Sequence, residues 1–119
     1  MPFKPLLNAL VERVPGAQGA IIADWEGESV DQVGIMDDYD LKVIGAHKGV
    51  ILHSMRDVVD RLGDDDLKEI VITTRQAQTV IMPVTEDYYL VLTLDRSDML
   101  GRALLEARRC IQGLYQEIV

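Results

Sequence analysis

The chain has 119 residues and a mass of 13.3 kDa, which suits one domain and is too short for two. Its 20 acidic and 12 basic residues give a net charge of −8, and 48% apolar residues exclude wholesale disorder. This charge argues against nucleic acid as the main partner and excludes a polybasic membrane anchor, because both need clustered cations. Seven of the acidic residues lie in residues 14–41, which contain no Lys or Arg.

The composition and termini indicate one cytoplasmic domain over residues 1–119. Cys110 is the single cysteine and cannot form an internal disulfide, which indicates a reducing compartment. Residues 1–5 lack the apolar core of a signal peptide, and no apolar run approaches the roughly twenty residues of a membrane span. No linker, low-complexity tract or convincing repeat divides the chain.

Hydrophobic periodicity predicts three helices and five strands along the chain. The first helix is expected to stop at Pro15-Gly16, and the middle helix to have Asp38 or Asp40 as its cap and Gly63 just past its end. The predicted ranges, in chain order, are a helix over 6–14, strands over 20–23 and 29–36, a helix over 40–62, strands over 67–74, 77–84 and 88–95, and a helix over 98–118.

The apolar pattern of two strands determines the predicted architecture. The strands that contain Ile21-Ile22 and Leu90-Val91-Leu92 are apolar at successive residues, so both faces of their sheet need cover. Three helices can provide it. We therefore expect an α+β fold, an α/β/α sandwich around five antiparallel strands, in the order helix-strand-strand-helix-strand-strand-strand-helix.

The middle helix carries more apolar surface than packing on one sheet requires. Val43, Ala46 and Val50 form a narrow apolar strip, and Gly45 and Gly49 stand one turn apart. Each glycine inside a helix costs about 1 kcal/mol relative to alanine. The largest apolar stripe is expected to face the core and comprises Leu41, Ile44, Ile51, Leu52, Met55, Val58, Val59 and Leu62.

Two interpretations of the glycines and the narrow strip stay open. In the first, the strip is partly exposed and the glycines are simply tolerated. In the second, which we favour, the helix also packs against its copy in a partner, with close backbones at the glycines, because a twofold pair is the commonest oligomer. The predicted interface comprises Val43, Gly45, Ala46, Gly49, Val50, Leu52 and Arg56.

The residues then show a family pattern. Val14-Pro15-Gly16-Ala17 leads into an apolar strand and Asp24-Trp25-Glu26-Gly27, and the glycine-bearing helix and a three-strand meander follow. Leu94-Asp95, followed by Leu100-Gly101 at the start of the last helix, completes the family pattern. In order and spacing the chain resembles the roadblock/dynein light-chain family over nearly its whole length. The resemblance implies a profilin-like sheet with the middle helix on one face and the terminal helices on the other.

The resemblance also implies a function. It implies homodimers in which middle helices pair and third strands join into one sheet. Family members divide between motor light chains and bacterial or archaeal regulators of small Ras-like GTPases, some of which accelerate GTP hydrolysis without an arginine finger. We expect a homodimeric, non-catalytic adaptor that binds such a GTPase and can modulate its hydrolysis. The alternatives are a structural light chain or scaffold subunit that ignores nucleotide and, least favoured, a small-ligand sensor.

The residues that could support catalysis or bind a metal lack the required spacing. His47 and His53 are six residues apart and point about 120° away from each other on a helix, so they cannot share a metal. Asp64-Asp65-Asp66 lacks the alternating oxygen ligands of a calcium loop, and Gly16-Ala17-Gln18-Gly19 is not a phosphate loop. We therefore expect no catalytic residues, cofactor or metal.

A predicted hairpin turn supplies the remaining surface feature. Asp24 to Glu28 fits such a turn, with Gly27 at positive φ and Trp25 at the tip. Trp25 is expected either to contact a partner or to fold back onto a terminal helix. Glu26 and Glu28 have no local structural role, and we expect them to steer a basic partner.

Overall fold

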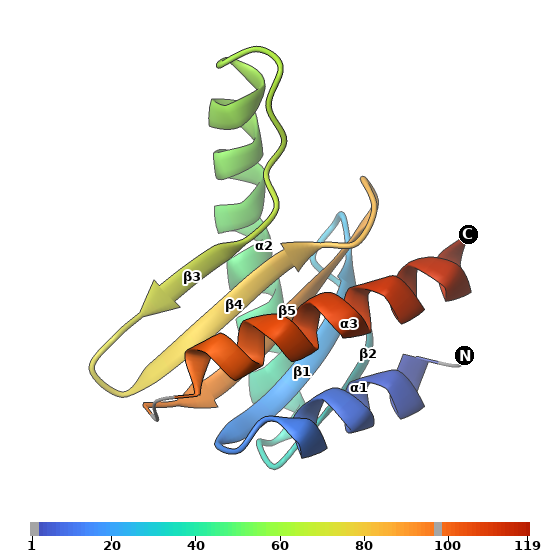
Figure 1. The fold of residues 1–119 in the computed structure, drawn as a ribbon, viewed down its shortest axis with the longest axis vertical. Helices are drawn as coiled ribbons and strands as arrows, with labels where there is room; N and C mark the ends of the chain where they lie inside the picture. The colour runs from blue at the N-terminus through green and yellow to red at the C-terminus, as the bar shows by residue number, and fades with distance from the viewer. Residues whose placement is uncertain (1–2, 97–98) are drawn as a thin grey trace.

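The computed structural model describes residues 3–96 and 99–119, which form three layers (Figure 1). The elements are α1 (Phe3–Arg13), β1 (Ala17–Asp24), β2 (Ser29–Gly34), α2 (Asp38–Asp60), β3 (Ile70–Thr73), β4 (Ala77–Pro83), β5 (Tyr88–Asp95) and α3 (Leu100–Ile118). All strand pairs are antiparallel, in the order β2-β1-β5-β4-β3, so β2 and β3 are the edges. The α+β class and the predicted element order are confirmed.

Several predicted boundaries shift, in helices, in β1 and in the edge strands: α1 begins at Phe3, β1 spans Ala17–Asp24 and α2 spans Asp38–Asp60. β2 ends at Gly34 instead of Met36, and β3 covers only Ile70–Thr73 of the predicted 67–74 range. These edge strands pair on one side only, so less of their apolar sequence is held in the sheet. β5 has the predicted range, whereas Asp98, the expected start of the last helix, lies outside the described residues.

The cap of α2 also differs from the prediction. Asp37 occupies the cap position and makes no side-chain cap hydrogen bond, so the expectation of Asp38 or Asp40 was wrong. Both of those carboxylates lie in the first turn, where negative charge interacts favourably with the helix dipole. Gly63, which has φ +97°, follows the helix end as expected.

Two cores lie on opposite faces of the sheet because successive strand residues point to opposite sides. Ile22 and Leu92 point toward α1 and α3, whereas Ile21 and Val91 point toward α2. All four side chains are fully buried. The prediction that both faces need cover is therefore confirmed, with the terminal helices on one face and α2 on the other (Figure 1).

The middle helix covers only part of its face of the sheet. It packs against β1, β2 and β5, and its C-terminal half extends past the strands (Figure 1). On β3, Ile70 and Ile72 point toward this face and stay half-buried. On the face of the sheet that α2 covers, the edge that includes β3 is therefore the less covered part. None of the helices within the described residues has the length and apolar character to cross a membrane.

Candidate functional site

The glycine-bearing side of α2 packs on the chain's own sheet. Gly45 and Gly49 are buried, and a Cβ atom added at Gly45 would lie 3.3 Å from Cγ2 of Ile21. A Cβ atom at Gly49 would overlap the Tyr89 hydroxyl and lie 2.9 Å from Cζ of that ring. The Tyr89 hydroxyl donates a 2.9 Å hydrogen bond to the carbonyl oxygen of Gly45. The close approach indicated by these glycines is therefore intramolecular, which corrects the expectation of a partner's backbone there.

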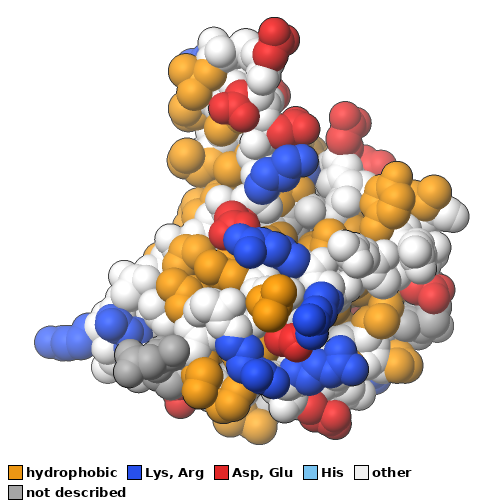
Figure 2. Space-filling model, in the orientation of Figure 1, with side chains coloured by type: hydrophobic (Ala, Val, Ile, Leu, Met, Phe, Trp, Pro, Cys, Tyr) orange, Lys and Arg blue, Asp and Glu red, His pale blue; other side chains and the backbone are white. Residues whose placement is uncertain are grey.

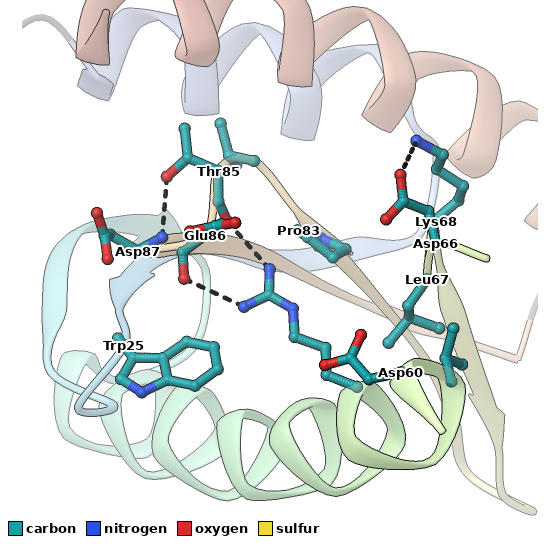
Figure 3. Close-up of a pocket in the computed structure, with 12 residues that line it drawn as sticks. Trp25, Asp60, Asp66, Leu67, Lys68, Pro83, Thr85, Glu86 and Asp87 are labelled. Carbon is teal, nitrogen blue, oxygen red and sulfur yellow. Dashed lines mark hydrogen bonds and ion pairs between the residues drawn. The ribbon is translucent and has the colours of Figure 1, made fainter. Parts of the chain in front are cut away.

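Two other residues of the expected interface also have partners within the chain. Leu52 is fully buried in the core between α2 and the sheet. Arg56 donates from Nη1 to the carbonyl oxygen of Glu86 at 3.1 Å and from Nη2 to that of Thr85 at 3.0 Å (Figure 3). These bonds tie α2 to the turn between β4 and β5. The fully buried Leu52 therefore cannot lie in an interface, whereas the interface role of Arg56 stays a prediction.

The apolar stripe expected to face the core does so only in part: Leu41 and Leu52 are fully buried, Ile44, Ile51 and Val59 are half-buried, and Met55, Val58 and Leu62 are exposed. We call Ile44, Ile51, Met55 and Val58 of α2, together with Leu62 in the turn after the helix, the outer stripe. Val58 is 49% exposed and Leu62 72%, whereas Ile44 and Ile51 border the same core as β3 residues Ile70 and Ile72. The expectation was therefore right for Leu41 and Leu52 and wrong for Met55, Val58 and Leu62, because the glycine side faces the sheet and turns the rest of the stripe toward the open β3 side of α2.

A second apolar strip lies on the opposite flank of α2. It consists of Tyr39, Val43, Ala46 and Val50, and thus contains the strip found in the sequence. Val50 is 66% exposed and Tyr39 is also largely exposed, while Val43 and Ala46 are half-buried. A Cβ atom at Gly27 would lie 3.5 Å from Cα of Ala46, so this flank borders the turn between β1 and β2. The helix therefore presents apolar surface on two separate flanks.

The hairpin tryptophan packs onto α2. The Trp25 and His53 ring centroids are 3.6 Å apart, and the Arg56 guanidinium carbon lies 4.9 Å from the centroid of the Trp25 ring. Trp25 therefore rests on the middle helix, which corrects the alternative of a terminal helix, and it stays 42% exposed. Glu26 and Glu28 are exposed, and their backbone amides each donate to Asp24 Oδ1 at 3.0 Å.

A polar groove of about 510 Å³ separates Trp25 and the end of α2 from the β4–β5 turn (Figure 3). Arg56 crosses it, and Asp60, Glu86 and Asp87 contribute carboxylates. At its edge, burial and the neighbouring Arg56 charge lower the pKa of His53, partly offset by Asp57. The polar side chains that line the groove do not point toward one common position, so we assign the groove no ligand.

The described residues offer no centre for metal or thiol chemistry. In the ranges 3–96 and 99–119, no three His, Cys, Asp or Glu side chains are placed to hold a metal ion. Burial raises the pKa of the Cys110 thiol to about 12, and its Sγ lies 3.7 Å from the carbonyl oxygen of Leu6. A protonated, buried thiol is unreactive as a nucleophile.

Comparison with known proteins matches this fold. The family model described as Roadblock/LC7 domain matches residues 5–94, and no curated protein sequence matches the chain. A Roadblock/LC7 domain from Streptomyces avermitilis superposes with a TM-score of 0.87 at 18% identity, over 95% of this chain and 94% of that one. MglB from Myxococcus xanthus gives 0.87 at 14%, over 98% and 94%. An MglB described in a tetrameric arrangement gives 0.86 at 18%, over 96% and 85%.

Proposed function

Because the chain belongs to the Roadblock/LC7 domain family, we propose that it is a homodimeric, non-catalytic adaptor that docks a small Ras-like GTPase and can modulate its GTP hydrolysis. One observation carries the proposal, namely that α2 exposes apolar side chains on two opposite flanks. A helix that packs on one sheet needs a single apolar face. Two further flanks provide one surface for a twin chain and another for a different partner.

The outer stripe is the proposed surface for the twin chain. It lies beside the open β3 edge, so a twofold axis there brings two α2 helices together and can join the two β3 strands into one sheet. Each pairing buries the same patch twice and satisfies backbone groups left open at the edge. The tetrameric arrangement described for one MglB shows that a protein of this fold can self-associate.

The second strip is the proposed contact for the GTPase. In such a dimer Tyr39 and Val50 lie on the flanks of α2 that face away from the twin helix, and they stay exposed. An aromatic residue among small apolar ones is typical of the anchor positions of a protein interface. The exposed acids Glu26 and Glu28 lie in the turn beside this strip and would speed the approach of a basic partner.

A matched pair of substitutions on one helix separates the two surfaces. Val58→Glu places a charge in the outer stripe, and we expect the variant to be a folded monomer of 13.3 kDa by light scattering. Val50→Glu places the same charge on the other flank, and we expect it to keep the dimer while it loses the GTPase. Circular dichroism serves as the control for folding. Loss of the dimer in the Val50 variant but not in the Val58 variant would contradict the assignment.

The alternative function, a structural light chain of a larger complex, predicts a different response to nucleotide. For a GTPase regulator, affinity for the small GTPase encoded nearest its gene should differ between the GTP-bound and GDP-bound forms. Calorimetric titration of both forms measures that difference. Equal affinities for both, together with an unchanged rate of GTP hydrolysis, would favour the light-chain function.

A further inference from the structure

The solvent side of α3 carries a cluster of positive charge in an acidic protein. Arg102, Arg108 and Arg109 are all exposed there, and Lys and Arg side chains gather over this helix in Figure 2. Leu105 and Tyr115, both about half-exposed, share the same surface. We call these five residues the α3 face. It lies on the opposite side of the sheet from α2 (Figure 1), so it is separate from both surfaces proposed above.

The three arginines differ in how far their charge is neutralised. Arg108 pairs with Glu69 at 2.8 Å, and Arg109 pairs at 3.0 Å with Glu106, which is only 5% exposed. Arg102 donates from Nε to the backbone carbonyl of Arg13, and no carboxylate among the described residues pairs with it. A carbonyl leaves the guanidinium charge in place. Within the ranges 3–96 and 99–119, Arg102 thus has a carbonyl partner only, and its remaining donors face no carboxylate there.

We propose that the α3 face is a docking surface for an acidic, amphipathic helix of a partner protein. Arg102 and Arg109 are seven residues apart, which places them about 10.5 Å apart along the helix axis. A second helix packed along α3 can present two carboxylates at the same spacing, with an apolar residue between them over Leu105. Guanidinium groups bind carboxylates through paired hydrogen bonds, and Arg and Tyr are enriched in protein interfaces.

The same observations argue against an anionic membrane or a nucleic acid as the occupant. Recognition of an anionic membrane typically needs a cluster of about four to eight cations. The α3 face has three arginines, which is fewer than that, and the whole chain carries −8. Long-range repulsion from that charge weakens attachment to an extended anionic surface, whereas a single acidic helix meets only the local patch.

The direct test is an NMR titration of the whole protein with a synthetic helix. The probe is an Ala/Leu-based peptide with two Glu residues seven apart, and its control carries Gln at both positions. We expect amide shifts confined to α3 with the Glu peptide and at least about tenfold weaker binding by the Gln peptide. Absence of shifts on α3, or equal binding of both peptides, would overturn the proposal.

A matched pair of charge reversals tests the residue assignment. Arg102→Glu and Arg75→Glu change the net charge equally, but Arg75 is an exposed residue of the β3–β4 turn. We expect about tenfold weaker binding for the Arg102 variant and less than about twofold for the Arg75 variant. Leu105→Ser, which leaves the charge unchanged, should also weaken binding. Equal losses at Arg102 and Arg75, or tighter binding to phosphatidylserine vesicles or duplex DNA than to the peptide, would exclude the acidic helix as the occupant.

Discussion

The two sides of α2 contrast in composition and in burial. The glycine side packs Gly45 and Gly49 closely on Ile21 and Tyr89 and buries Leu52, whereas the outer stripe is half-buried or exposed. A glycine lets a helix axis approach a sheet closely, and a large ring from the sheet can fill the space that a side chain would take. The closeness of packing, rather than the amount of apolar surface, decides which side of such a helix faces its own sheet.

The largest expected effect comes from a pair of truncations on opposite sides of α2. Leu52→Ala opens a cavity in the core, and we expect it to lower the free energy of unfolding by about 2–5 kcal/mol. Val50→Ala removes an exposed side chain and should change that free energy by no more than about 0.5 kcal/mol. Urea denaturation measures both. Similar losses in the two variants would mean that α2 is rotated differently on the sheet.

A methyl group added on the glycine side is the second test. We expect Gly49→Ala to lower the free energy of unfolding by about 1–3 kcal/mol, because the new Cβ meets the Tyr89 ring. Gly101→Ala is the control, since no described residue beyond its own helical turn lies within 4 Å of the added atom and the helix gains a better helix former. Adding Tyr89→Phe to the Gly49→Ala variant should recover part of the lost free energy of unfolding. A higher free energy of unfolding for Gly49→Ala than for the parent would contradict the close contact between Gly49 and the Tyr89 ring.

The hydrogen bond between Tyr89 and Gly45 gives a smaller effect. Tyr89→Phe should cost about 1 kcal/mol, the usual net value of a hydrogen bond, because it leaves the buried carbonyl of Gly45 without that partner. Burial, with a lesser contribution from the Asp24 charge, raises the pKa of Tyr89 from 10.0 to about 12. The contribution of the protonated Tyr89 hydroxyl to the free energy of unfolding should therefore be complete below pH 10 and be lost as the pH rises toward 12. A pH dependence equal to that of the Phe variant would contradict this.

The smallest expected effect is at His53, beside Trp25. Its pKa is lowered from 6.5, chiefly by burial and then by Arg56, so the unfolded chain takes up a proton at higher pH than the folded chain. Stability should therefore fall as the pH drops through 6.5, and His53→Gln should reduce that fall. His47→Gln, which changes an exposed residue of the same helix, is the control. Thermal melts at several pH values would contradict the prediction if both variants behaved like the parent.

Much of the fold is predictable from local pattern. Successive apolar residues such as Ile21-Ile22 in β1 require cover on both faces of the sheet. The three helices, which the apolar spacing predicts, supply that cover. Periodicity gives the angles between residues of α2 but not the absolute rotation of the helix. That rotation depends on contacts such as Tyr89 with Gly45, 44 residues apart, and Arg56 with Glu86, 30 apart. A signal for the first was present: two glycines one turn apart on the helix, together with Tyr89 directly before the apolar run Leu90-Val91-Leu92 of a central strand.

The pairing of two chains through the outer stripe is tested most directly by light scattering of the purified protein at micromolar concentration. The exposed Val58 and Leu62, beside the open β3 edge, predict a mass of about twice 13.3 kDa. They also predict that Val58→Glu reduces the mass to that of one chain without loss of secondary structure. A parent protein that stays at 13.3 kDa would contradict the pairing.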